Sequence, residues 1–302
     1  MPIRLATRRS PLARWQAARV AALLRALPGA PAVDVVPVET TGDRLSTVPL
    51  ASIGGQGVFV TEVQQAVQRG DADVAVHSAK DLPAATPEGL VVAAVPERGD
   101  PRDALVGGRL GTLGPGALVA TGSPRRRAQL AAARPDLRFA ELRGNIATRL
   151  AQVGQVDAVV VAVAALQRLG VADRADDVLA PSVVLPQVAQ GALAVECRSA
   201  DTELVGLLAA IDDPVARRAV EAERAFLAAA GGGCRAPLGA LASVPVAGGP
   251  LVLQAMVASG DGHVVLRCRV AGDDPHALGA AAYEDLVRHR GASLVLGPAG
   301  RS

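Results

Sequence analysis

The stretch IRLATRRSPLARWQAARVAALLRALPG, residues 3–29, decides the fold class because a strand pattern gives way to a helix pattern inside it. Ile3–Ala6 is a short run of β-branched and apolar residues, which is typical of a strand. Ser10-Pro11 then supplies an N-cap and a first helical residue, and Pro28-Gly29 ends the helical spacing of apolar residues. A strand followed closely by a helix predicts an α/β fold.

The same alternation continues along the chain. Further strands are expected at Ala32–Glu39, Val74–Val76, Leu90–Val95, Leu118–Ala120, Leu137–Glu141, Ala158–Val163 and Gly191–Cys197. Helices are expected at Val58–Gln68, at Pro124–Ala133 and from Asn145 to about Val153. Strands that alternate with helices of this length predict largely parallel sheets, and the two series are candidates for one shared fold.

The length of 302 residues predicts two or three domains, and breaks in the pattern divide the chain into three. We expect domain 1 at residues 1–96 and 190–210, domain 2 at residues 100–186 and domain 3 at residues 212–302. In the last domain a helix at Pro214–Ala229 precedes three strand-like runs, and a helix at His276–His289 follows them. Strands that do not alternate with helices predict a small α+β domain.

Composition excludes several classes of protein. Lys and Arg number 31 against 29 Asp and Glu, and this balance disfavours a nucleic-acid coat or a membrane-surface protein. Aromatic residues make up 2% of the chain, so no platform for stacked bases is expected. Short apolar runs predict no membrane span and no signal peptide. Three cysteines without C-x-x-C spacing predict no disulfide framework and no metal site, and favour the cytoplasm.

Arginines gather where three expected helices begin. Ser123-Pro124-Arg125-Arg126 and Leu142-Arg143-Gly144-Asn145 are two such places, and Arg8 precedes Ser10 at the first helix. Backbone N–H groups and the helix dipole favour anions there, and guanidinium groups make bidentate contacts with carboxylates. The pattern predicts a cleft for a polyanion at the carboxyl ends of the strands. The alternative is a solvated surface of an Arg-rich chain.

The run His77-Ser78-Ala79-Lys80-Asp81 directly follows the expected strand Val74–Val76. Lys80 is the sole lysine of the chain, which makes it a candidate for a position where a planar guanidinium does not fit. Asp81 offers a carboxylate for proton transfer among positive charges. The alternative is a structural role, in which Asp81 forms a salt bridge or stabilises a turn. For His77 we favour a buried structural imidazole.

The run Gly231-Gly232-Gly233-Cys234 comes at the end of an expected helix. Three glycines allow a loop with positive φ, so the thiol of Cys234 is expected to be exposed and able to act as a nucleophile. Cys197 and Cys268 lie in strand patterns and are expected in the core.

Several motifs, in one order, resemble the porphobilinogen deaminase family, also called the hydroxymethylbilane synthases. The motifs are Leu5–Ala13, Val76–Pro83, Thr121–Arg126, Leu142–Asn145, Ala164–Gly170, Leu185–Arg198 and Gly232–Cys234. The resemblance runs from Ile3 to about Gly239, and beyond that it rests on length and strand pattern.

The resemblance implies two domains like periplasmic binding proteins, with parallel-rich mixed sheets, and a small third domain that carries a covalent cofactor. That cofactor is dipyrromethane, held by a thioether to Cys234. The family condenses four porphobilinogen molecules head to tail on this primer, releases ammonia, and hydrolyses off the linear tetrapyrrole hydroxymethylbilane. The resemblance thus implies a cytoplasmic, monomeric transferase of porphyrin and heme biosynthesis, with no nucleic-acid or membrane partner.

Residue roles follow from the same resemblance. Asp81 matches the catalytic carboxylate, and Phe59 belongs to a loop that closes as a lid. Positions that hold cofactor and substrate are matched by Arg8, Ser10, Ser78, Lys80, Thr121, Ser123, Arg125, Arg126, Arg143, Gly144, Arg149, Arg168 and, near the hinge, Gln190.

The chain departs from the family pattern in three places. Ala79 stands where Met is common, Gly122 stands where Ser is common, and the segment around Thr41-Gly42-Asp43 lacks basic residues of many bacterial relatives. An alternative of another class is a non-catalytic, two-lobed binding protein for organic anions, which needs neither Cys234 nor Asp81. RNA binding by the arginines is a third reading, which the few aromatic residues disfavour.

Overall fold

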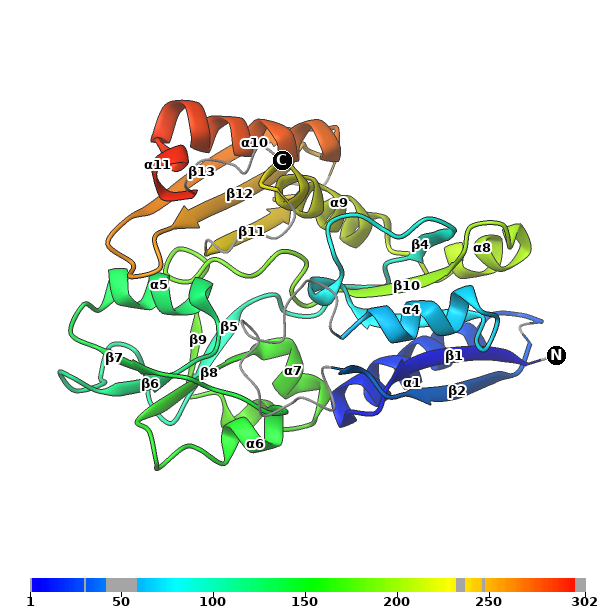
Figure 1. The fold of residues 1–302 in the computed structure, drawn as a ribbon, viewed down its shortest axis with the longest axis horizontal. Helices are drawn as coiled ribbons and strands as arrows, with labels where there is room; N and C mark the ends of the chain where they lie inside the picture. The colour runs from blue at the N-terminus through cyan, green and yellow to red at the C-terminus, as the bar shows by residue number, and fades with distance from the viewer. Residues whose placement is uncertain (1, 30, 42–58, 232–236, 246–247, 297–302) are drawn as a thin grey trace. The chain divides into compact units, whose positions relative to one another are not determined.

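The computed structural model describes residues 2–29, 31–41, 59–231, 237–245 and 248–296, drawn in colour in Figure 1. Contacts divide the chain into two compact units. The first comprises Met1–Gly99 and Gly191–Arg217, and the second comprises Asp100–Gln190 and Arg218–Ser302. The three-domain boundaries drawn from the sequence stay a prediction.

The first unit is built on a five-stranded sheet of order β2-β1-β3-β10-β4. Its strands are β1 (Ile3–Arg8), β2 (Val33–Val38), β3 (Val74–Ser78), β4 (Leu90–Ala94) and β10 (Leu193–Arg198). Its helices are α1 (Pro11–Arg25), α4 (Thr61–Gln68) and α8 (Thr202–Ala209), with a 3-10 turn at Ala79–Asp81. β1 runs parallel to β2 and β3, whereas β10 runs antiparallel to β3 and β4.

Helices cover both faces of this sheet (Figure 1). Leu5 and Val76 face the side on which α1 and α8 pack, and Ala6 and Ala75 face α4. Alternate residues of a strand point to opposite faces, so a sheet covered on both sides has strands that are apolar throughout. The cap expected from the sequence is present, because the Ser10 hydroxyl accepts a hydrogen bond from the backbone N–H of Ala13.

The second unit contains a sheet of order β7-β6-β8-β5-β9. Its strands are β5 (Asp103–Val106), β6 (Leu118–Ala120), β7 (Arg138–Ala140), β8 (Ala158–Ala162) and β9 (Asp177–Leu179). Helix α5 (Pro124–Ala133) packs on one face, and α6 (Ile146–Leu150) and α7 (Val163–Arg168) pack on the other, with a 3-10 turn at Ala172–Arg174. β6 is parallel to β7 and β8, and β5 is antiparallel to β8 and β9.

The two sheets therefore share one topology. In each, the second strand in the order has a parallel neighbour on either side, and an antiparallel strand lies fourth. β5 is the first strand after the chain enters the second unit, and β10 is the first strand after the chain returns to the first unit. The sequence patterns did not reveal β5, β9, α7 or α8, and they extended the helix after Asn145 three residues beyond its observed end at Leu150.

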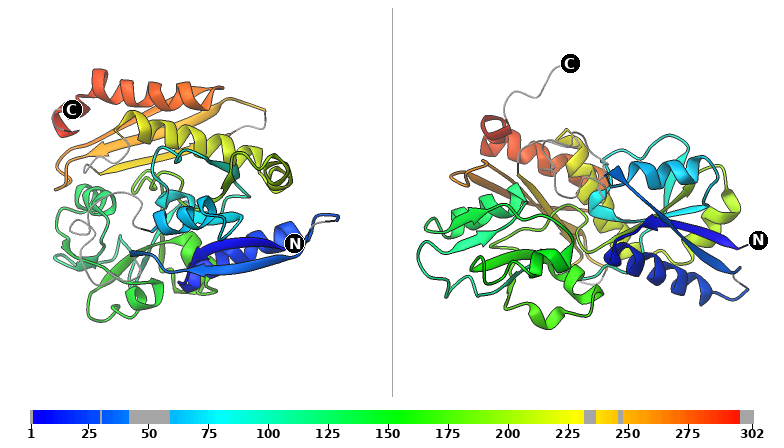
Figure 2. Two further views of the ribbon diagram at one scale, coloured as in Figure 1. Left: turned by 45° about the vertical axis from the view of Figure 1, so that its right-hand side comes forward. Right: turned by 60° about the horizontal axis from the view of Figure 1, so that its bottom comes forward.

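The second unit also holds an antiparallel sheet of β11 (Leu238–Ser243), β12 (Leu251–Ala258) and β13 (Val265–Gly272). Helices α9 (Pro214–Ala229), α10 (Pro275–Arg290) and α11 (Ala292–Leu296) accompany it (Figure 2). α10 packs on β12 and β13, and it meets α9 at Gly279, where a Cβ would lie 2.5 Å from the backbone nitrogen of Phe226. The predicted fold class, two mixed α/β sheets plus a small α+β part, is confirmed. Over the described ranges, no helix has the length and apolar character that crossing a membrane requires.

Candidate active site

The Asp81 carboxylate lies on a short turn at the end of a buried strand. Strand β3 is buried from Val74 to His77, and Ala79–Asp81 then form a single 3-10 turn closed by a hydrogen bond from Leu82 N–H to the Ala79 carbonyl oxygen, at 3.3 Å. The side chains of Ser78, Lys80 and Asp81 are partly exposed. A rigid strand therefore presents one carboxylate and one ammonium at an accessible turn.

Two buried side chains of the first unit hold the end of β3 in place. The Gln16 amide, on α1, donates a hydrogen bond to the Ser78 hydroxyl at 2.8 Å. The His77 Nε2 atom lies 3.1 Å from an oxygen of Glu196 on β10, and both side chains are buried, as expected for a structural imidazole. Gln16 was missed in the sequence, although a polar residue among the apolar positions of a helix was the available signal.

The guanidinium group of Arg8 stacks on an aromatic ring. Its Cζ atom lies 4.2 Å from the centre of the Phe59 ring, within the range of a cation–π contact. Most of the expected lid, residues 42–58, lies outside the described residues, so closure of that loop stays a prediction. Phe59 itself already covers one of the cations expected to bind substrate.

The turn between β6 and α5 is ordered by its own side chains. The Thr121 hydroxyl accepts a hydrogen bond from Ser123 N–H at 3.2 Å, and the Ser123 hydroxyl accepts one from Arg126 N–H at 3.4 Å. Ser123 is thus the N-cap of α5, as the sequence predicts. A third predicted cap is also present, since the Asn145 side chain accepts from Thr148 N–H at 3.0 Å.

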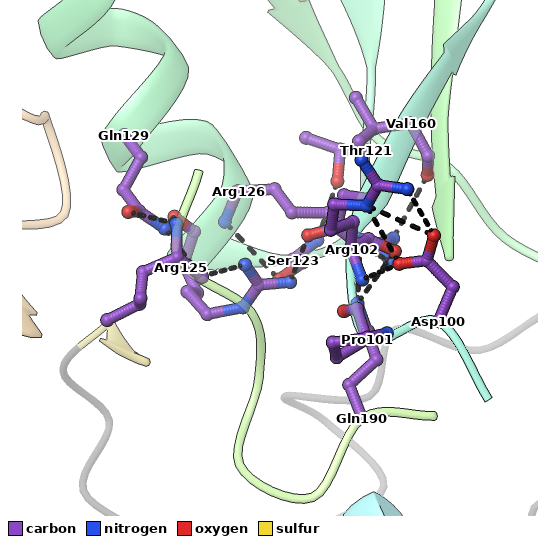
Figure 3. Close-up of polar contacts among 12 residues, drawn as sticks. Asp100, Pro101, Arg102, Thr121, Ser123, Arg125, Arg126, Gln129, Val160 and Gln190 are labelled. Atoms are coloured by element: carbon purple, nitrogen blue, oxygen red, sulfur yellow. Dashed lines mark hydrogen bonds and ion pairs between the residues drawn. The ribbon is translucent and has the colours of Figure 1, made fainter. Parts of the chain in front are cut away.

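Arg125 and Arg126 are buried and bind a carboxylate of the protein itself (Figure 3). Arg125 Nη2 lies 2.7 Å from Asp103 Oδ2, and Arg126 Nη2 lies 2.6 Å from Asp103 Oδ1. Asp103 begins β5, a strand that the sequence patterns did not reveal. Burial acts to raise the pKa of Asp103, but the two guanidinium charges hold it well below its usual range.

Three other arginines, around α6 and at the end of α7, are more accessible than Arg125 and Arg126. Arg143 and Arg149 are partly exposed, and Arg149 Nε donates a hydrogen bond to the Gly144 carbonyl oxygen at 2.8 Å. Arg168, at the end of α7, is also partly exposed, and burial of part of its side chain lowers its pKa to about 10. Guanidinium groups such as these suit carboxylate ligands.

Gly122 lies where the β6–α5 turn meets the turn before α6, and Gly144 shapes the second of these turns. A Cβ on Gly122 would lie 2.6 Å from the Leu142 carbonyl oxygen, so the β6–α5 turn and the turn before α6 touch backbone to backbone. This close approach gives a physical reason for the glycine at position 122. Gly144 has φ of +88°, and its Cβ would lie 2.8 Å from Thr148.

We expect Gly144→Ala to lower the melting temperature more than Gly154→Ala. Both glycines have positive φ, but a Cβ on Gly154 meets nothing within 4 Å, whereas on Gly144 it meets Thr148 at 2.8 Å. The strained backbone costs roughly 1–2 kcal/mol in both variants, and the clash adds to it only in the first. Thermal unfolding of both proteins measures the difference, and equal melting temperatures would show that the contact with Thr148 relaxes freely.

Gln190 is fully buried. Its Nε2 atom donates to the Pro101 carbonyl oxygen at 2.7 Å and to Asp103 Oδ1 at 2.8 Å. Cys234 lies outside the described residues. Cys197 and Cys268 are buried as expected, and burial raises the pKa of each thiol to about 11, which leaves them protonated and poorly nucleophilic at neutral pH.

Comparison with known proteins identifies the family. Residues 3–206 match the model of the porphobilinogen deaminase dipyrromethane cofactor binding domain, and residues 217–288 match that of the porphobilinogen deaminase C-terminal domain. A porphobilinogen deaminase from Roseiflexus castenholzii is 45% identical over 299 residues, covering 97% of this chain and 98% of the relative. One from Acidothermus cellulolyticus is 52% identical over 251 residues, covering 80% and 75%.

Similarity to solved structures is weaker. The substrate-binding protein of an amino acid ABC transporter aligns with 13% identity and a TM-score of 0.36, covering 70% of this chain and 90% of that one. The two family models together span almost the whole chain, in the order of its motifs. The chain therefore belongs to the porphobilinogen deaminase family, the hydroxymethylbilane synthases, which are transferases of tetrapyrrole biosynthesis with a dipyrromethane cofactor.

Proposed function

We propose that this chain condenses four porphobilinogen molecules on a dipyrromethane primer with Asp81 as its catalytic carboxylate. The observation that carries the proposal is the family match over residues 3–206, which includes the partly exposed turn of Asp81. We further propose a cytoplasmic monomer without nucleic-acid or membrane partners, a reading supported by the near-neutral net charge of +2. Nothing observed favours the alternative of a non-catalytic anion-binding protein.

The residues present fit the cofactor. Each pyrrole ring of dipyrromethane carries an acetate and a propionate, so the group is a polyanion. Partly exposed cations that suit it are Arg8, Lys80, Arg143, Arg149 and Arg168. We propose that the thiol of Cys234 holds the group by a thioether. The low reactivity of the two buried thiols, Cys197 and Cys268, supports this assignment. When bound, the cofactor supplies the primer to which substrate units are added.

Asp81 acts on the positive charge that develops during condensation. Loss of ammonia from porphobilinogen leaves an electron-poor azafulvene, and the pyrrole nitrogens carry cationic character as the new bond forms. A carboxylate held near those nitrogens stabilises that charge and assists proton transfer. The buried strand β3 and the hydrogen bond between Gln16 and Ser78 fix the base of the turn. The carboxylate therefore needs little reorganisation during the reaction.

The cations bind and orient the carboxylates of the substrate. Lys80 adjoins Asp81 in the sequence, and its compact ammonium suits a position beside the reacting ring. Arg8, stacked on Phe59, provides a second cation in the same unit. In the second unit, Arg143 precedes the N-cap of α6, and Arg149 lies in the last turn of that helix.

We expect Arg149→Leu to raise the KM for porphobilinogen about tenfold or more. A charge-assisted hydrogen bond to a carboxylate contributes about 1.5–3 kcal/mol, and a loss of about 1.4 kcal/mol corresponds to a factor of ten. Initial rates over a range of substrate concentrations measure the effect. Arg109→Leu is the control, because Arg109 is exposed and lies in no family motif. An unchanged KM in Arg149→Leu would count against this binding role.

The proposed function itself is tested with the wild-type protein. Purified protein incubated with porphobilinogen is expected to release ammonia and form hydroxymethylbilane, and its intact mass is expected to exceed that of the chain by one dipyrromethane unit. A protein that binds porphobilinogen reversibly, gains no mass and forms no product would support the anion-binding alternative instead.

A further inference from the structure

We propose that Asp103 is a positioning residue that fixes Arg125 and Arg126 for the binding of substrate and cofactor carboxylates. This inference rests on the proposed function. The role is unexpected for a negatively charged residue, because Asp103 would promote the binding of other anions at the β6–α5 turn. Neither a resemblance nor a sequence pattern pointed to this residue.

One buried carboxylate organises the cluster. Asp103 is fully buried, and its Oδ1 atom accepts hydrogen bonds from Arg126 Nε at 3.1 Å, Arg126 Nη2 at 2.6 Å and Gln190 Nε2 at 2.8 Å. Its Oδ2 atom accepts from Arg125 Nη2 at 2.7 Å. Three side chains, two from the start of α5 and one from Gln190, thus meet on one acceptor.

Each guanidinium group is held from a second side by the backbone. Arg125 Nη1 donates to the Leu185 carbonyl oxygen at 2.6 Å, and Arg126 Nη1 donates to the Val160 carbonyl oxygen at 3.0 Å. A planar guanidinium bound on two sides keeps one orientation. Figure 3 shows Arg125, Arg126 and Gln190 meeting at this cluster below the start of α5.

The cluster retains positive charge. Two guanidinium groups share one carboxylate, and the buried Nε atom of Arg125 has no hydrogen-bond partner among the described residues. Because Asp103 stays ionised well below neutral pH, the two guanidinium groups and the one carboxylate carry a formal charge of +1. This charge still attracts the carboxylates of a ligand, although the cluster is buried.

The arginine positions are coupled to the turn above them. Arg126 N–H is bound by the Ser123 hydroxyl, and Ser123 N–H is bound by the Thr121 hydroxyl. A displaced Arg126 would therefore disturb the N-cap and the free N–H groups at the start of α5. Loss of Asp103 would also leave two buried cations without a counter-charge, and like charges so close repel each other.

The test relies on the negative charge of Asp103, because charge counting and positioning predict opposite changes in the KM. Simple charge counting predicts that Asp103→Asn, which removes a negative charge, lowers the KM for porphobilinogen. Positioning predicts that the KM rises about tenfold, with a smaller change in kcat, and that less of the purified protein carries the cofactor by intact mass. A lowered or unchanged KM in folded Asp103→Asn protein that carries the cofactor would overturn the proposal.

A double-mutant cycle separates positioning from a general loss of stability. If Asp103 acts through Arg125 and Arg126, then adding Asp103→Asn to a protein that already carries Arg125→Gln and Arg126→Gln changes the KM less than about twofold, because both groups it positions are absent. Full multiplication of the effect of Asp103→Asn and the effect of the two arginine substitutions would also overturn the proposal. Failure of the wild-type protein to form product would instead contradict the proposed function.

A less disruptive variant and its control test the proposal if the Asp103→Asn protein does not fold. Gln190→Met removes one hydrogen bond to Asp103 without stranding a charge, and we expect the KM to rise at least threefold. Gln68→Met is the control, because Gln68 is exposed on α4 and donates to the Glu88 carbonyl oxygen at 3.2 Å, outside the Asp103 cluster. Equal KM values for Gln190→Met and Gln68→Met would reject the role of Asp103.

Discussion

Asp81→Asn is expected to lower turnover of porphobilinogen by a factor on the order of 10² or more, with a melting temperature near that of the wild type. Asn keeps the size of the side chain and one of its oxygens but loses the charge and the titratable proton. The partly exposed Asp81 has no ion pair to lose within the described ranges, so the defect should appear in rate rather than in stability.

The assay for Asp81→Asn needs protein that intact mass shows to carry the cofactor, because cofactor assembly uses the same condensation chemistry. Asp34→Asn serves as control, since Asp34 is an exposed carboxylate on β2, away from the turn at the end of β3. Turnover within a few-fold of wild type, in cofactor-loaded Asp81→Asn protein, would remove Asp81 from the catalytic role.

Cys234→Ser is expected to abolish the covalent adduct and to reduce product formation to background. A thioether forms from a thiolate, and a serine hydroxyl is far less acidic and less nucleophilic at neutral pH. The other thiols cannot substitute, because Cys197 and Cys268 are buried and their pKa values are raised to about 11. Intact mass of the purified variant measures the adduct.

The Cys234→Ser protein should remain folded, since the substitution changes one atom in a glycine-rich segment. Circular dichroism and thermal unfolding check this point. A normal adduct mass in this variant, with Cys197 and Cys268 intact, would show that the cofactor is attached elsewhere and would falsify the assignment of Cys234.

Local chemistry was predictable from the sequence, and long-range chemistry was not. The caps at Ser10, Ser123 and Asn145 depend on residues three positions apart, and all three are present. Strand β6 and helix α5 have the predicted bounds for the same reason. The contact between Asp103 and Arg126 spans 23 positions, and no periodicity reports it. The sequence therefore predicted arginines at a helix start but not the carboxylate that binds two of them.

Strand β5 shows why part of the fold could not be predicted from local sequence patterns. It has four residues and begins with a charged side chain, so neither alternation nor an apolar run marks it. Gln16 escaped notice for a different reason: its partner Ser78 comes from a strand 62 positions away. In both cases the topology of the sheet, rather than the local sequence, brings the functional contact together.

The antiparallel strand shared by both sheet topologies has a consequence for synthesis on the ribosome. All five strands of the second sheet lie between Asp103 and Leu179, so that sheet can close soon after its own segment emerges. The first sheet cannot, because β4 is hydrogen-bonded in the sheet only to β10, which begins at Leu193. At about 5–20 residues per second, β3 and β4 wait on the order of ten seconds with unpaired edges. During that interval the nascent chain exposes strand edges that can pair with other chains, which is the kind of exposure that chaperones shield.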